Sequence, residues 1–145
     1  MTKWFSILAA GVAALVLVTA QPAVAQSDKP HKMVIQVSTA DPDVHRIALN
    51  NAVNLQKALG PDEVEVEIVA YGPGLSIFTA KSPESARVPD LALQQVTFSA
   101  CGNTMNKMAE KSGEEVQLVD GVQVVPAGVL RIMELQEQGY TYIRP

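Results

Sequence analysis

Runs of apolar residues that suit buried strands alternate with segments of helical periodicity along most of the chain, and this alternation limits the fold more than any other feature. Strands are predicted at residues 31–38, 63–71, 95–100, 122–125 and 140–143. Strands separated by helices pair in parallel and bury both sheet faces under helices. The sequence therefore predicts an α/β fold, a parallel sheet of five strands with helices on both faces.

The first helix has the clearest signals at its ends. Asp41-Pro42-Asp43 supplies a capping carboxylate, a proline suited to the first turn and an acidic residue at the positive end of the helix dipole. Gly60-Pro61 ends the helix, which predicts a helix over 42–59. Further helices are expected at 102–112, with Met105, Met108 and Ala109 facing inward, and from Pro126 to Gly139.

Residues 75–95 carry mixed signals. The stretch 75–80 suits one or two helical turns, and Leu91-Ala92-Leu93 can begin another helix. Pro83 and Pro89 are expected to break any continuous helix across this stretch. The sequence leaves the structure of this stretch open.

The first 25 residues have the three parts of a secretory signal peptide. Lys3 is followed by an almost wholly apolar run over 5–20, and Ala23-Val24-Ala25 supplies the small residues of a cleavage site. The alternative is a retained membrane anchor, but the run is shorter than the ~20 residues that span a bilayer. We predict cleavage after Ala25, a periplasmic protein, a flexible leader at 26–30 and one domain at 31–145.

The charge of the chain excludes some partners. Removal of Lys3 with the signal peptide changes the formal net charge from −4 to −5, and lysines and arginines form no cluster. We therefore expect neither nucleic acid nor, after cleavage, a membrane surface as a partner.

Cys101 is the only cysteine, so the domain has no internal disulfide. In an oxidising compartment such a thiol is buried and inert, paired between subunits, or used in chemistry. It follows the third predicted strand, and ligands of parallel α/β sheets bind beyond the carboxyl ends of the strands. At the start of a helix, the dipole and the N–H groups of Gly102, Asn103 and Thr104 would favour a thiolate. A thiol that merely packs is the alternative.

Several established kinds of site are absent from the sequence. A second cysteine for a redox pair is missing, and His31 and His45 lie far apart with no metal-binding cluster around them. We predict no metal and no cofactor. Gly72-Pro73-Gly74 is too short for a dinucleotide-binding loop. It is better suited to a turn, although Gly72 and Gly74 can also shape a binding site at this edge of the sheet.

Two charged or titratable residues are open to two interpretations each. His45 lies in the first turn of the first helix, near the same edge as Cys101, and is a candidate to stabilise a thiolate or move a proton. A solvated surface histidine is the interpretation we favour. Arg131, in the last helix, either contributes charge to the site or faces water.

Four stretches of the chain resemble the DsrE/DsrF-like family. They are YGPGL at 71–75, FSACGNTM at 98–105, VVPAGV at 124–129 and ELQEQGYTYIRP at 134–145. The resemblance implies a three-layer α/β/α domain around a five-stranded parallel sheet, assembled as a homotrimer or homohexamer. In the sulfur-relay members of this family, a cysteine after the third strand carries sulfur between proteins as a persulfide, and Cys101 occupies the matching position.

The resemblance and the position of Cys101 together suggest a periplasmic sulfur carrier or sulfurtransferase that forms a persulfide on Cys101. Its partners would be a sulfur donor and a sulfur acceptor protein. The alternative is a non-catalytic oligomeric binding module that holds a small ligand or partner at the edge of the sheet, and a third possibility is a purely structural subunit.

Overall fold

The computed structural model describes residues 29–145, so the predicted signal peptide and residues 26–28 of the leader lie outside the described residues. The strands are β1 (His31–Val37), β2 (Val64–Ala70), β3 (Val96–Cys101), β4 (Val122–Val125) and β5 (Thr141–Ile143). They form one sheet in the order β4-β3-β2-β1-β5, and every neighbouring pair is parallel. The predicted five-stranded parallel sheet is confirmed.

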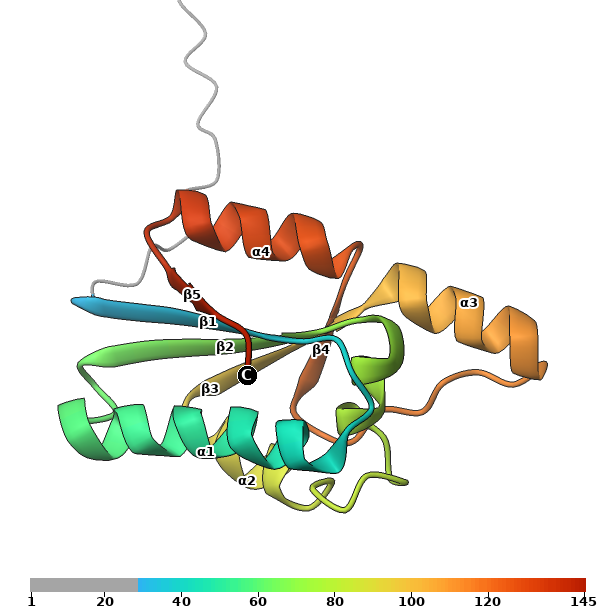
Figure 1. The fold of residues 1–145 in the computed structure, drawn as a ribbon, viewed down its shortest axis with the longest axis horizontal. Coiled ribbons are helices and arrows are strands. Elements are labelled where there is room, and N and C mark those ends of the chain that lie inside the picture. The colour runs from blue at the N-terminus through green and yellow to red at the C-terminus, as the bar shows by residue number, and fades with distance from the viewer. Residues whose placement is uncertain (1–28) are drawn as a thin grey trace, which may run out of the picture.

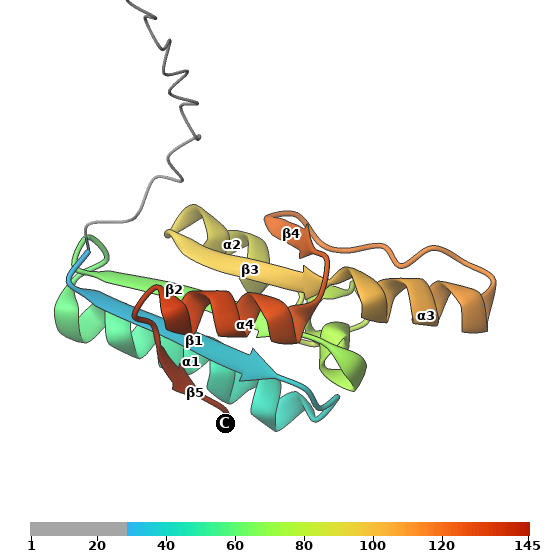
Figure 2. The same cartoon turned by 90° about the horizontal axis from the view of Figure 1, so that it is seen from above.

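Helices cover both faces of the sheet, as Figure 1 shows. They are α1 (Pro42–Leu59), the short 3-10 helix η1 (Gly72–Phe78), α2 (Arg87–Leu93), α3 (Gly102–Ser112) and α4 (Gly128–Glu137). Helices α1 and α2 lie on one face and α4 lies on the other, which gives the predicted three layers. Helix α3 extends beyond the carboxyl ends of the strands (Figure 2).

Helix α1 begins and ends as its sequence predicts. The Asp41 carboxylate accepts a hydrogen bond from the Asp43 N–H at 2.9 Å, and Pro42 occupies the first turn. The helix ends at Gly60, whose φ of 98° is one that side chains rarely adopt. Its buried face includes Leu49, which packs against the sheet.

The main core lies between the sheet and helices α1 and α2. Residues of β2 alternate between the two faces: Val64, Val66 and Ile68 enter this core, whereas Glu65 and Glu67 point to the α4 face. A smaller apolar cluster lies under α4 and consists of Val34, Val69, Ile132, Leu135 and Tyr140. The sheet face under α4 is therefore partly polar.

One expectation about helices is wrong and a second is wrong in part. Helix α2 begins at Arg87 and runs through Pro89, because a proline in the first turn removes an N–H that has no partner within the helix. Helix α3 buries none of its residues completely. Met105 packs against the main core, as predicted, but Met108 is 38% exposed. Met108 lies on a helix that extends beyond the carboxyl ends of the strands.

No helix within residues 29–145 is long and apolar enough to cross a membrane.

Candidate functional site

Cys101 lies where three segments meet at the carboxyl edge of the sheet. It is the last residue of β3 and caps the N-terminus of α3, as the sequence predicts. It pairs with Val125 of β4, and the loop that follows β4 leads to Gly128, the first residue of α4. The starts of α3 and α4 therefore both lie beside Cys101, which is 5% exposed.

Hydrogen-bond donors surround the thiol. Burial raises the pKa of Cys101, but the Thr104 hydroxyl and the backbone N–H groups of Gly128, Thr104 and Asn103 lower it. The donors outweigh burial, so the pKa is below its ordinary value. The site favours a thiolate, which is the nucleophilic form of cysteine.

Thr104 is held in place by the start of η1, just after β2. The Gly72 N–H donates to Thr104 Oγ1 at 2.9 Å. Because this bond occupies a lone pair of the hydroxyl, the hydroxyl proton remains available for the sulfur of Cys101. Gly72 has a φ of +55°, a left-handed conformation that suits glycine.

Gly128 and Tyr71 are site residues that the sequence analysis did not select. A Cβ added to Gly128 would lie 3.0 Å from Cδ1 of Tyr71 and 3.3 Å from Cβ of Cys101. Any other residue here would force Tyr71 or Cys101 to move by a few tenths of an ångström, so glycine best suits the close approach of α4 to Cys101. The signal in the sequence was a glycine three residues after the end of β4, at the edge where ligands of α/β sheets bind.

The other predicted site residues hold the loops of this edge together. Asn103 N–H also donates to the carbonyl of Pro126 at 3.2 Å, and a Cβ on Gly102 would lie 3.2 Å from the carbonyl oxygen of Val125. Gly74 packs on the end of β1, where a Cβ would lie 2.4 Å from the carbonyl oxygen of Val37. Gly102 and Gly74 thus allow close backbone packing.

The favoured interpretation of His45 as a solvated histidine is wrong. The side chain is 2% exposed, and Nε2 lies 2.8 Å from the carbonyl oxygen of Thr39, in the loop between β1 and α1. Its Nδ1 has no hydrogen-bond partner. No hydrogen bond joins His45 to Cys101 in the part of the chain that the structure describes. The helper role remains a prediction.

Arg131 binds a carboxylate beneath α4. Its Nε and Nη2 donate to the two oxygens of Glu67 at 2.8 and 2.7 Å. Burial opposes the charge of Arg131, but the hydrogen bond with Glu67 outweighs it and raises the guanidinium pKa. Sequence analysis missed Glu67 as a partner because the two residues lie 64 positions apart.

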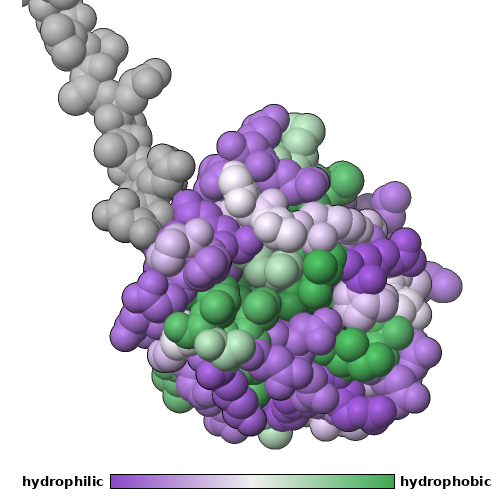
Figure 3. All heavy atoms as spheres, turned by 60° about the vertical axis from the view of Figure 1, so that its left-hand side comes forward, coloured by the Kyte–Doolittle hydropathy of each residue, from purple (hydrophilic) through white to green (hydrophobic). Residues whose placement is uncertain are grey.

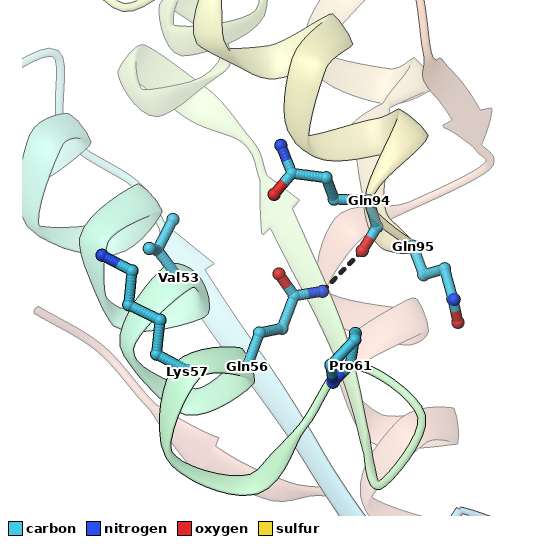
Figure 4. A pocket seen from close by; sticks show the side chains of 6 residues that line it. All are labelled: Val53, Gln56, Lys57, Pro61, Gln94 and Gln95. Carbon is cyan, nitrogen blue, oxygen red and sulfur yellow. Dashed lines mark hydrogen bonds between the residues drawn. The ribbon is translucent and has the colours of Figure 1, made fainter.

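Two hollows lie at the opposite, amino end of the strands. The larger hollow has a volume of about 290 Å³, and its lining includes Gln56, Lys57, Gln94 and Gln95 (Figure 4). The Gln56 side chain donates a hydrogen bond to the Gln94 carbonyl at 2.6 Å. The second, of about 200 Å³, lies between the start of β1 and the end of α1, at an end where Figure 3 shows a gathering of apolar side chains. Neither hollow includes Cys101.

Comparisons with known proteins agree with this architecture. A model of the DsrE/DsrF-like family matches residues 13–145. The fold is similar to that of a solved protein of unknown function from Methanobacterium thermoautotrophicum, with a TM-score of 0.70 and 32% sequence identity. That similarity covers 79% of this chain and 99% of the other. A search of curated proteins finds no significant match. The chain belongs to the DsrE/DsrF-like family.

Proposed function

We propose that this protein is an exported sulfur carrier that forms a persulfide on Cys101. The observation that carries the proposal is the position of Cys101 at the N-cap of α3 and beside Gly128, where α4 begins. At this place the Thr104 hydroxyl and neighbouring backbone N–H groups lower the pKa of the thiol. Proteins of the DsrE/DsrF-like family generally serve in sulfur relay, and Cys101 lies at the place where the resemblance puts the sulfur-carrying cysteine.

Loading would be a thiolate exchange at sulfur. The Cys101 thiolate attacks the outer sulfur of a donor persulfide, R–S–SH. A bond forms between Cys101 Sγ and that sulfur, the S–S bond of the donor breaks, and its electron pair leaves with the donor as R–S⁻. The proton stays on the transferred sulfur. The product is Cys101–S–SH, and no external oxidant or reductant is consumed.

Unloading would use the same donors in reverse. An acceptor thiolate attacks the outer sulfur of the Cys101 persulfide, and Cys101 leaves as a thiolate. Thiols of lower pKa leave faster, so the hydroxyl and N–H groups that stabilise the Cys101 thiolate assist this step as well. One arrangement of neutral donors therefore suits both halves of a carrier cycle.

Export and assembly form part of the proposal. Residues 1–25 would be removed as a signal peptide and leave the carrier in the periplasm. The outer side of α4 exposes Val129, Leu130 and Met133, with Val129 68% exposed. A homotrimer or homohexamer that covers this surface would bury apolar side chains directly after Gly128.

Intact mass spectrometry after incubation with inorganic polysulfide tests the carrier function. The native protein should gain sulfur mass, a reductant should remove it, and Cys101→Ser should gain none. A thiol that stays unmodified in native protein and reacts only after denaturation would remove the carrier function and leave the binding module as the better account. A disulfide-linked dimer in protein purified without reductant would show that Cys101 pairs between subunits.

A further inference from the structure

Polar side chains from three strands and one helix form a connected network beneath α4. Glu67 of β2 is 2% exposed, and its carboxylate accepts both hydrogen bonds of the Arg131 guanidinium. The Ser99 hydroxyl of β3 donates to Glu67 Oε1 at 2.6 Å and accepts from Gln123 Nε2 of β4 at 2.9 Å. The network thus connects β2, β3 and β4 to the first turns of α4.

Two members of this network, Ser99 and Arg131, lie two or three residues along the chain from Cys101 and Gly128, respectively. Ser99 precedes Cys101 by two residues on β3, so the two side chains lie on the same face of the sheet. Arg131 follows Gly128 by three residues, within the turn that begins α4. The network therefore connects the strand that holds the sulfur with the helix whose first residue, Gly128, lies beside Cys101.

Stability alone does not explain this ion pair, in which Glu67 is buried but the Arg131 side chain is 27% exposed. Well-packed apolar residues often stabilise a fold as much as a buried ion pair does. A guanidinium bound to a carboxylate through two parallel hydrogen bonds fixes orientation as well as distance. Orientation matters here because α4 begins in close contact with Tyr71 and Cys101, at 3.0 and 3.3 Å from the place of a Gly128 Cβ.

We propose that Glu67 and Arg131 are positioning residues for Cys101: their ion pair holds the start of α4 so that the Gly128 N–H points at the sulfur. This inference rests on the proposed carrier function. Within residues 29–145, the groups that shift the ionisation of Cys101 are all neutral, which favours action through placement over action through charge. The other ionisable groups that interact with Arg131 are Glu134, at 4.0 Å, and Tyr140.

Two substitutions distinguish whether the Glu67–Arg131 pair acts on Cys101 by positioning α4 or by its own charges. Arg131→Lys keeps the positive charge but loses the two parallel hydrogen bonds. Glu67→Gln removes a negative charge near the site. If the pair acts through placement, both variants hold less thiolate at neutral pH than the wild type. If the pair acts through charge, Arg131→Lys resembles the wild type and Glu67→Gln holds more thiolate. Glu134→Gln on the same helix is the matched control and should resemble the wild type.

The measurement is the rate of Cys101 alkylation by iodoacetamide in native protein across a range of pH. Near pH 7 both variants should react about tenfold more slowly than the wild type, the order expected when one hydrogen bond to a charged group is lost. Near pH ~10 the rates should converge, because the thiol is ionised in every variant. Circular dichroism and thermal unfolding establish which variants fold.

Ser99→Ala provides a milder test if the ion-pair variants fail to fold, since it removes one hydrogen bond to Glu67 and keeps both charges. It should also slow alkylation near pH 7. Folded variants with the pH profile of the wild type would overturn the positioning role. Failure of the wild type to take up sulfur from polysulfide would instead overturn the carrier function, so the two failures are distinguishable.

Discussion

The backbone N–H of Gly72 and the hydroxyl of Thr104, 32 positions apart, are joined by a hydrogen bond of 2.9 Å. This bond connects the start of η1, just after β2, to the first turn of α3 and orients the hydroxyl that lowers the pKa of Cys101. The ionisation of the thiol therefore depends on a loop from another strand as well as on its own helix.

Replacement of Thr104 by valine tests this dependence. Thr104→Val keeps the shape of the side chain but removes a donor to the thiolate and leaves the Gly72 N–H without its acceptor. We expect slower alkylation of Cys101 at neutral pH and a loss of about 1–3 kcal/mol in the free energy of unfolding. Thr104→Ser keeps the hydroxyl and is the control. Equal alkylation rates in the valine and serine variants would contradict the role of the hydroxyl.

We expect the free energy of unfolding to depend more on the glycine at position 74 than on the glycine at position 102. In Gly74→Ala the new Cβ meets backbone atoms of Val37 at 2.4 Å, whereas in Gly102→Ala the nearest backbone atom, the Val125 oxygen, is 3.2 Å away. We expect Gly74→Ala to lower the free energy of unfolding by about 1–3 kcal/mol, and Gly102→Ala to lower it less. Urea unfolding of both variants measures the difference, and the reverse order would contradict the packing described for Gly74.

The exposed side of α4 should mediate self-association. We expect light scattering of the wild type at micromolar concentration to give the mass of a closed trimer or hexamer. Val129→Glu with Met133→Glu should give a folded monomer, because charges placed in an apolar interface oppose its burial. Leu93→Glu is the control: Leu93 is 87% exposed, but it lies on α2, on the opposite face of the sheet. A monomeric wild type would refute this assembly.

The mature chain is expected to begin at Gln26. Ala23-Val24-Ala25 supplies the cleavage site, and the preceding apolar run is short for a membrane anchor. Fractionation of cells followed by intact mass measurement of periplasmic protein checks the new N-terminus. Protein in the membrane fraction that retains residues 1–25 would show that the segment stays as an anchor.

Local patterns were sufficient to predict the sheet, the ends of α1 and the position of Cys101. Each of these depends on nearby residues: apolar periodicity, Asp41 and Gly60 at the helix ends, and a cysteine directly after a strand. The structure of 75–95 could not be predicted, because Pro89 is compatible both with a break and with the first turn of α2.

The contacts around the site could not be predicted because they depend on how distant segments pack. Glu67 alternates with apolar neighbours, as a solvated residue of a half-buried strand would, and it is buried only because α4 covers that face. His45 is likewise buried by its contact with the loop after β1. Local periodicity does not show which helix covers which face.

The ionisation of Cys101 in the native protein tests the central claim most directly. Cys101 is the only cysteine, so the difference in ultraviolet absorbance between the wild type and Cys101→Ser reports its thiolate alone. Because the hydrogen-bond donors lower the pKa of Cys101, the thiolate of native protein should form at lower pH than that of the chain unfolded in denaturant. A native thiol that ionises at the same or a higher pH than the unfolded chain would contradict a site built to hold a thiolate.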